Sequence, residues 1–112
     1  MTSYQVNPSR LKQETIEASK RISGLVCKTP VEHSPYLSKL GNCDLFLKLE
    51  SLQVTGSFKF RGAANHILSL TNEERKSGIV TASTGNHAAA CASAAEHAKV
   101  PATIYLPENA DK

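Results

Sequence analysis

From residue 44 onward, short apolar runs alternate with longer segments that have helical periodicity. Alternating strands and helices joined by short loops are typical of right-handed β-α-β units and a parallel sheet. The pattern predicts an α/β fold, with a partial parallel sheet of three strands and flanking helices. The predicted strands are 45–49, 79–83 and 102–106, and the predicted helices between them are 57–70 and 86–98.

The first 43 residues are predicted to be a helical and irregular lead-in to this β-α-β-α-β unit, so that 1–112 forms one segment. Asn7-Pro8 supplies an N-cap and a proline at the first helical position, and Gly24 is expected to end that helix. Residues 26–38 are expected to be extended or irregular, and Pro35–Leu40 to form a short helix. Three strands do not complete a parallel sheet, which needs cover on both faces. The chain is therefore expected to be the N-terminal piece of a larger α/β enzyme, or a truncated relative of one.

Composition excludes several classes of protein. The chain has 13 Lys and Arg against 10 Asp and Glu, and these charges are dispersed rather than gathered in the basic stripe of a nucleic-acid-binding protein. No apolar run approaches the roughly 20 residues that span a bilayer. The cysteines Cys27, Cys43 and Cys91 fit no metal-ligand spacing, and an odd number without a signal peptide favours a reducing, cytoplasmic location.

Lys59 is the first candidate for chemistry, because it stands at the expected start of the 57–70 helix between Phe58 and Phe60. The positive end of a helix disfavours an ammonium group, and a neutral amine is what Schiff-base formation requires. By spacing alone, a solvated surface lysine is the more common interpretation.

The second candidate is the loop Ser83-Thr84-Gly85-Asn86-His87, which joins a predicted strand to a predicted helix. In parallel α/β sheets, ligands bind beyond the carboxyl ends of the strands. Free amides of such a loop, together with the helix dipole, suit a carboxylate or a phosphate. Ordinary turn chemistry accounts for the same residue types equally well.

The two motifs together, Ser57-Phe58-Lys59-x-Arg61-Gly62 followed by Ser83-x-Gly85-Asn86-His87, resemble the fold-type II pyridoxal-phosphate enzymes. The order is most similar to the threonine/serine dehydratase and serine racemase branch. The resemblance covers residues 27–112, including Lys28-Thr29-Pro30 and 49–53. It implies a fold of the tryptophan synthase β type.

The resemblance also implies roles for individual residues. Lys59 matches the lysine that holds pyridoxal 5'-phosphate as a Schiff base and then moves the substrate's Cα proton. Phe58 matches the residue that packs beside the cofactor ring, and Asn86 matches the asparagine that hydrogen-bonds its phenolic oxygen. The loop that receives the substrate carboxylate corresponds to Ser83, Thr84, Gly85 and His87.

The implied activity is an ammonia-lyase reaction that converts a hydroxy-amino acid, threonine or serine, into a 2-oxo acid and ammonia. Racemases of this branch resemble a pattern with serine at the position of Thr84, where the hydroxyl is an acid/base on the other face of the ring. The extra methyl group of Thr84 is expected to favour elimination over racemisation. The family's glycine-rich phosphate loop has no counterpart in residues 63–112, so little catalysis is expected of these 112 residues alone.

Two alternatives come from other classes of protein. The chain could be an inactive structural or regulatory partner of a full-length homologue, or a subunit of a homo-oligomer, because an incomplete sheet leaves an edge strand for pairing. A nucleotide-binding α/β module ranks last, since the strand-helix loops lack both glycine-rich phosphate motifs.

Overall fold

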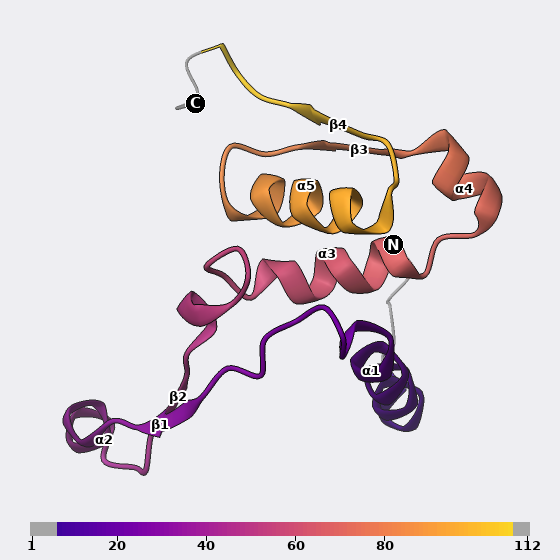
Figure 1. Cartoon of the computed structure of the whole chain (residues 1–112). Helices are drawn as coiled ribbons and strands as arrows, with labels where there is room; N and C mark the ends of the chain where they lie inside the picture. Colours follow the sequence, from indigo (N-terminus) through magenta and orange to yellow (C-terminus); the bar gives the residue numbers. More distant parts are fainter. Residues whose placement is uncertain (1–6, 109–112) are drawn as a thin grey trace, which may run out of the picture.

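The computed structural model describes residues 7–108 and has two parts, a helix-and-sheet body and a projecting arm (Figure 1). The body contains two helices packed beneath a small parallel sheet, and the arm carries a short antiparallel ribbon. In chain order the elements are α1 (Pro8–Ile22), β1 (Val31–His33), α2 (Pro35–Gly41), β2 (Phe46–Lys48), the 3-10 turn η1 (Glu50–Leu52), α3 (Lys59–Leu68), α4 (Asn72–Ser77), β3 (Ile79–Ala82), α5 (Asn86–Ala98) and β4 (Ala102–Tyr105).

Helix α1 begins as its sequence predicts. The Asn7 side chain accepts hydrogen bonds from the backbone amides of Ser9 and Arg10, and Pro8 occupies the first helical position. The helix ends at Ile22, two residues before Gly24, because the Ser23 amide already closes the last turn on the Lys20 carbonyl. The predicted lead-in starts at residue 1 and the predicted β-α-β-α-β unit runs to residue 112. Residues 1–6 and 109–112 of these two segments lie outside the described residues.

The expectation of three parallel strands is wrong in one respect. Within residues 7–108, only β3 and β4 pair in parallel, with Ile79 opposite Ala102. The predicted strand 45–49 forms as β2, but it pairs antiparallel with β1, with Val31 opposite Lys48. Residues 31–33, expected to be irregular, supply this partner. The amide of Leu49 also donates to the Pro30 carbonyl, so β2 is held by the arm rather than by the sheet of the body.

The core lies between α3 and α5, which make the most extensive contact between any two elements. Phe60 and Ala64 on α3 and Ala90 on α5 have no exposed surface. Ala90 and Ala94 lie one turn apart on α5, and their small side chains allow the two helices to approach closely and pack with few voids. The buried cluster is Ile22, Phe60, Ala63, Ala64, Ile67, Ala90, Cys91, Ala94, Ala95 and Val100.

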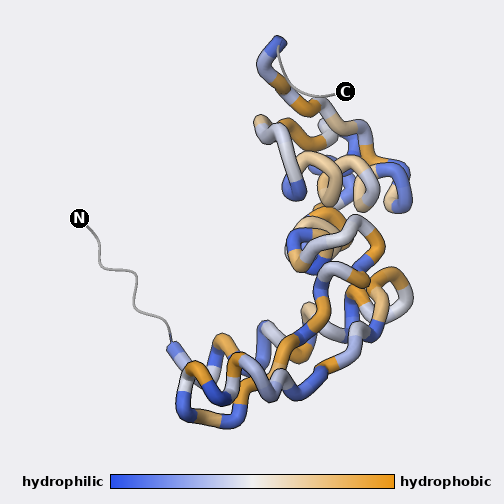
Figure 2. Tube along the Cα trace, turned by 90° about the vertical axis from the view of Figure 1, so that its left-hand side faces the viewer, coloured by the Kyte–Doolittle hydropathy of each residue, from blue (hydrophilic) through white to orange (hydrophobic). Residues whose placement is uncertain are grey.

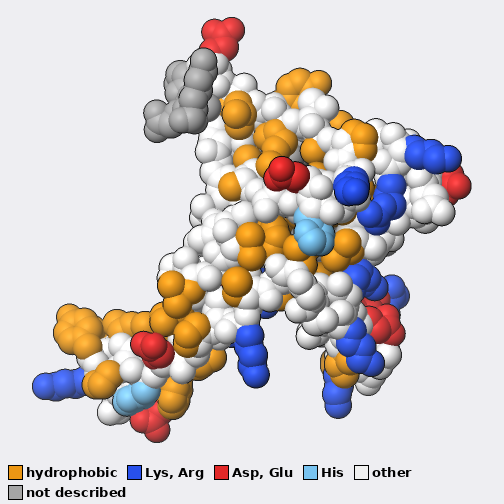
Figure 3. Space-filling model, viewed as in Figure 1, with side chains coloured by type: hydrophobic (Ala, Val, Ile, Leu, Met, Phe, Trp, Pro, Cys, Tyr) orange, Lys and Arg blue, Asp and Glu red, His pale blue; other side chains and the backbone are white. Residues whose placement is uncertain are grey.

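The arm stands away from this core. The radius of gyration is 17.1 Å, whereas a compact domain of this size has one of about 13 Å. Figure 2 shows the strands and helices of the body stacked above the arm when the molecule is viewed from the side. Apolar side chains gather over the arm in Figure 3; the exposed ones there include Val31, Tyr36, Leu40, Phe46 and Leu47.

The helices that flank the sheet match the sequence pattern closely. Helix α4 has the full capping box, in which the Thr71 hydroxyl accepts from the Glu74 amide and the Glu74 carboxylate accepts from the Thr71 amide. Helix α5 has the predicted bounds, and α3 is two residues shorter at each end than the predicted 57–70. Over residues 7–108, no helix has the length and apolar content needed to cross a bilayer.

Gly78 allows the chain to turn into β3 beside Pro101. It has φ 80° and ψ −174°, a region that is essentially open to glycine alone. A Cβ at this position would lie 2.6 Å from the Pro101 carbonyl oxygen. Gly78→Ala is therefore expected to destabilise the fold by at least about 2 kcal/mol, through backbone strain and the clash.

The measurement is the urea midpoint of unfolding, followed by far-ultraviolet circular dichroism. Gly24→Ala is the control, because a Cβ at Gly24 meets nothing within 4 Å. Equal midpoints for the two variants would contradict the role given to Gly78.

Candidate functional site

Helices α3 and α5 begin at the same end of the body. Figure 1 shows the two helices running in the same direction beneath β3 and β4, with both N-termini at the end where β3 finishes. Lys59 is the first residue of α3, and Asn86 is the first residue of α5. The structure therefore brings the two predicted loops to one end of the fold, at the carboxyl end of a parallel strand, where α/β proteins bind ligands.

Lys59 is exposed at this end of α3. Its Nζ lies 5.1 Å from the centroid of the Phe58 ring, within the range of a cation–π contact. Phe58 occupies the N-cap position and is 63% exposed. An exposed aromatic ring beside an exposed amine offers an apolar surface on which a planar group could stack.

The second loop presents its backbone to the same end. Ser83 is half-buried, whereas Thr84, Gly85, Asn86 and His87 are exposed. Within the loop, the Gly85 amide donates to the Ser83 hydroxyl at 3.4 Å. A Cβ on Gly85 would meet nothing within 4 Å, so the loop is open on that side.

Both helices at this end lack a side-chain cap, unlike the other α-helices in the described part of the chain. Helices α1, α2 and α4 are capped by the side chains of Asn7, Ser34 and Thr71. The N-cap positions of α3 and α5 are Phe58 and Gly85, and neither forms a side-chain cap. The first amides of an uncapped helix can donate to an anion, although in α3 the amides of Phe60 and Arg61 already donate to the carbonyls of Ser57 and Phe58.

Two hydroxyl groups next to Lys59 also lack partners. The Oγ1 of Thr55 and the Oγ of Ser57 are buried without a hydrogen-bond partner among the described residues, and Ser57 is only 7% exposed. Buried hydroxyls are normally satisfied, so an unsatisfied one needs an explanation. Free amides, unsatisfied hydroxyls, an amine and an exposed ring are the groups that a planar anionic aldehyde such as pyridoxal phosphate would need.

His87 faces back toward the core rather than standing alone in the loop. Its Nε2 lies 3.5 Å from the Sγ of Cys91, one helical turn later. Both residues line a cavity of about 250 Å³ between α3, α5 and β3. Burial raises the pKa of the Cys91 thiol, which agrees with the expectation that Cys91 is a small apolar residue of the core.

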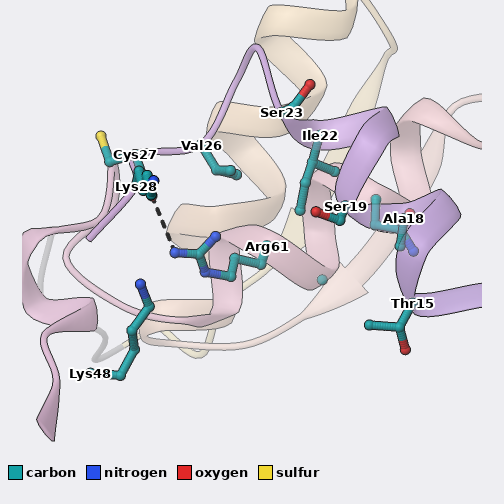
Figure 4. Close-up of a pocket in the computed structure, with 12 residues that line it drawn as sticks. Thr15, Ala18, Ser19, Ile22, Ser23, Val26, Cys27, Lys28, Lys48 and Arg61 are labelled. Atoms are coloured by element: carbon teal, nitrogen blue, oxygen red, sulfur yellow. Dashed lines mark hydrogen bonds between the residues drawn. The ribbon is translucent and has the colours of Figure 1, made fainter. Parts of the chain in front are cut away.

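Arg61 is part of the first motif, but the sequence alone predicts no role for it. Arg61 forms a two-pronged ion pair with Glu50, with Nε to Oε2 at 2.8 Å and Nη2 to Oε1 at 2.7 Å. Arg61 Nη2 also donates to the Cys27 carbonyl (Figure 4, dashed line). The buried side chain of Gln53 holds the backbone of Cys27 by two further hydrogen bonds. Because Arg61 is 11 residues from Glu50 and 34 residues from Cys27, no local sequence pattern predicts this network.

A cavity larger than the one beside His87 lies next to this network and not at Lys59. It has a volume of about 660 Å³ between α1, α3 and residues 26–28, and Arg61, Lys28 and Lys48 reach toward it (Figure 4). Neither Lys59 nor any residue of the 83–87 loop lines it. Size alone therefore does not mark the site, and the exposed helix ends are the better candidate.

Comparisons with known proteins show which family and fold this chain resembles. An L-threonine ammonia-lyase from Thermotoga maritima is 47% identical over 94 residues, which is 84% of this chain and 23% of that protein. Among solved structures, a serine racemase from Dictyostelium discoideum matches with a TM-score of 0.84 and 42% identity, over 89% of this chain and 33% of that one. A threonine deaminase from Solanum lycopersicum matches with a TM-score of 0.80 and 30% identity, over 95% of this chain and 30% of that one.

The chain thus spans between about a quarter and a third of the length of these relatives. The structural matches confirm the predicted fold, that of the fold-type II enzymes. A family model described as pyridoxal-phosphate dependent enzyme matches residues 22–112, which include both loops of the site. This chain belongs to the family of pyridoxal-phosphate-dependent enzymes.

Proposed function

We propose that this chain is the amine-bearing part of an ammonia-lyase that acts on a hydroxy-amino acid, threonine or serine. The observation that carries the proposal is the exposed Lys59 at the uncapped start of α3, at the same end of the body as the uncapped start of α5. The identity to an L-threonine ammonia-lyase supports the reaction class. The overall change removes the Cα proton and the β-hydroxyl and ends in a 2-oxo acid and ammonia.

Lys59 would hold the aldehyde carbon of pyridoxal 5'-phosphate through Nζ, and Phe58 would lie beside the ring. The bound cofactor would supply an electron sink that makes the Cα proton of the amino acid acidic. The Lys59 amine would also be the base that takes that proton.

The 83–87 loop binds the substrate carboxylate in this proposal. Its free amides and the positive end of α5 favour a negative charge. The side chain of Asn86 would hold the cofactor ring through a hydrogen bond to its phenolic oxygen. Ser83 and Thr84 would contact the carboxylate, and His87 would contribute its backbone amide, because its ring packs against Cys91. Gly85 leaves room for the substrate to approach the backbone, because nothing lies within 4 Å of its would-be Cβ.

The amine of Lys59 is expected to be the main point of attachment for the cofactor. After the chain is mixed with pyridoxal 5'-phosphate and reduced with borohydride, peptide mapping should place most of the adduct on Lys59. Lys59→Arg keeps the positive charge and should abolish the yellow absorption of the unreduced mixture.

Lys76→Arg is the matched control, since Lys76 is an exposed lysine of α4, which lies at the opposite end of the body from the starts of α3 and α5 (Figure 1). Its absorption should equal that of the unsubstituted chain. An adduct spread evenly over the lysines, or one retained in full by Lys59→Arg, would contradict the proposal.

Thr84 should direct the outcome toward elimination. Its hydroxyl stands where a racemase would hold its second acid/base, and its methyl group crowds that face. A full-length relative with threonine at this position should convert L-serine to more pyruvate than D-serine, as measured by chiral chromatography. The matched Thr→Ser variant should raise the D-serine fraction. Because solved serine racemases match this fold closely, D-serine in excess of pyruvate would make racemisation the better assignment.

A second candidate, association with a longer homologue, is favoured by the open face of the β3–β4 sheet. Helix α5 covers one face, whereas Val80 and Tyr105 on the other face are 71% and 65% exposed. Parallel sheets are normally covered on both faces, so another polypeptide would gain apolar burial there.

If association is the function, the tagged chain should co-purify with a full-length homologue. The variant Val80→Lys with Tyr105→Lys should lose that partner, whereas Lys76→Arg should keep it. A well-folded monomer that retains no homologue would count against association.

A further inference from the structure

We propose that Arg61 and Glu50 are positioning residues that fix the turn carrying Lys59, an inference that rests on the proposed role of Lys59 as the cofactor-binding amine. Arg61 follows Lys59 by two residues on α3, so both belong to the first turn of that helix. A rigid element that holds a reacting group in place contributes to catalysis by limiting its misplacement.

The pair is well ordered by its geometry. The two parallel hydrogen bonds between Arg61 and Glu50 measure 2.7 and 2.8 Å, the bidentate arrangement that gives an arginine–carboxylate pair its directionality. The side chains of Arg61 and Glu50 are 31% and 16% exposed, whereas those of the Arg10–Glu14 pair on α1 are 76% and 54% exposed. A partly buried bidentate pair is screened less than a surface pair.

The network around this pair joins three separate segments, which are residues 27–29, η1 and α3. Glu50 lies on η1, and its Oε1 also accepts from the Thr29 hydroxyl at 2.5 Å. Arg61 Nη2 donates to the Thr29 hydroxyl at 3.3 Å and to the Cys27 carbonyl at 3.1 Å. The Arg61 guanidinium thus connects α3 to residues 27–29, which precede β1, and to η1.

Apart from this network, the loop between η1 and α3 is held within the described residues by local hydrogen bonds to Gln53, from the Gly56 amide to its carbonyl and from the Val54 amide to its side chain. Gly56 has a φ of 69°, the Thr55 and Ser57 hydroxyls lack partners, and α3 has no side-chain cap. Gln53, 4% exposed, secures the start of the loop by binding both the amide and the carbonyl of Cys27. Arg61 secures its end, so Lys59 lies within a segment fixed at both sides by one network.

The charge state of the pair suits a constant positioning role. The hydrogen bond from Arg61 is the main cause that lowers the pKa of Glu50 from 4.5 to about 2, and the Thr29 hydroxyl contributes. The same contact raises the pKa of Arg61. Both groups therefore remain charged and hydrogen-bonded to each other at neutral pH. Arg61 is then unavailable as a proton donor to a substrate.

The test compares Arg61→Lys and Glu50→Gln with the control Glu14→Gln, which removes a carboxylate from an exposed ion pair on α1. The first measurement is hydrogen–deuterium exchange of the amides of residues 54–62 in the cofactor-free chain. Both network variants should exchange at least about tenfold faster there, because a charge-assisted bidentate contact has been lost. Exchange within α5 should not change in any variant.

The second measurement is the ratio of Lys59 adduct to Lys76 adduct after treatment with pyridoxal 5'-phosphate and borohydride. Both network variants should lower this ratio by about tenfold or more, because a misplaced amine loses its advantage. Glu50→Gln keeps the size of the side chain and one oxygen acceptor, so it reports on the pair even if Arg61→Lys folds poorly.

Unchanged exchange over 54–62, an equal increase throughout the chain, or an unchanged adduct ratio would each overturn the positioning role. The exchange result is independent of the cofactor. If the unsubstituted chain shows no preference for Lys59, the proposed function fails, and the exchange measurement still decides whether Arg61 and Glu50 order this turn.

Discussion

The contact between α3 and α5 determines where the chemically interesting residues lie. Alanines on both helices allow the backbones to lie close together, and the large buried side chains of Phe60 and Ile67 fill the remaining space. Because both helices run the same way, their N-termini meet at one end of the body. Loops that are separated by about one β-α step in the sequence thereby become neighbours.

The two helices at this site begin without the side-chain caps that would stabilise their first turns. The α-helices outside the site are capped by Asn7, Ser34 and Thr71, and a cap of this kind is worth about 1 kcal/mol. Phe58 and Gly85 offer no such cap. The first amides of α5 keep their donors for a ligand, whereas at the start of α3 the amides of Phe60 and Arg61 already donate to the carbonyls of Ser57 and Phe58. The Arg61–Glu50 pair offsets part of this loss by tying the first turn of α3 to η1 and to residues 27–29.

Local patterns predicted the local features of this chain. The asparagine before Pro8, the capping box at Thr71 and the alanine run of α5 each act over a few residues, and each element formed as expected. The two site loops were found in the same way, because their residue order resembles that of a known family. Pairing between distant segments was not predictable: a five-residue apolar run at 45–49 does not indicate whether its partner is Ile79 or Val31. The Arg61 network was missed for the same reason, since Glu50 and Cys27 are 11 and 34 residues away.

The most direct test of the account is a titration of the isotopically labelled chain with pyridoxal 5'-phosphate, followed by amide nuclear magnetic resonance. If the two helix ends form one site, the amides of 57–61 and of 84–88 should shift together along one binding curve. The β1–β2 ribbon, which lies in the arm, should remain unaffected. Shifts confined to one of the two loops, or scattered around exposed lysines, would show that the helix ends do not act as a single site.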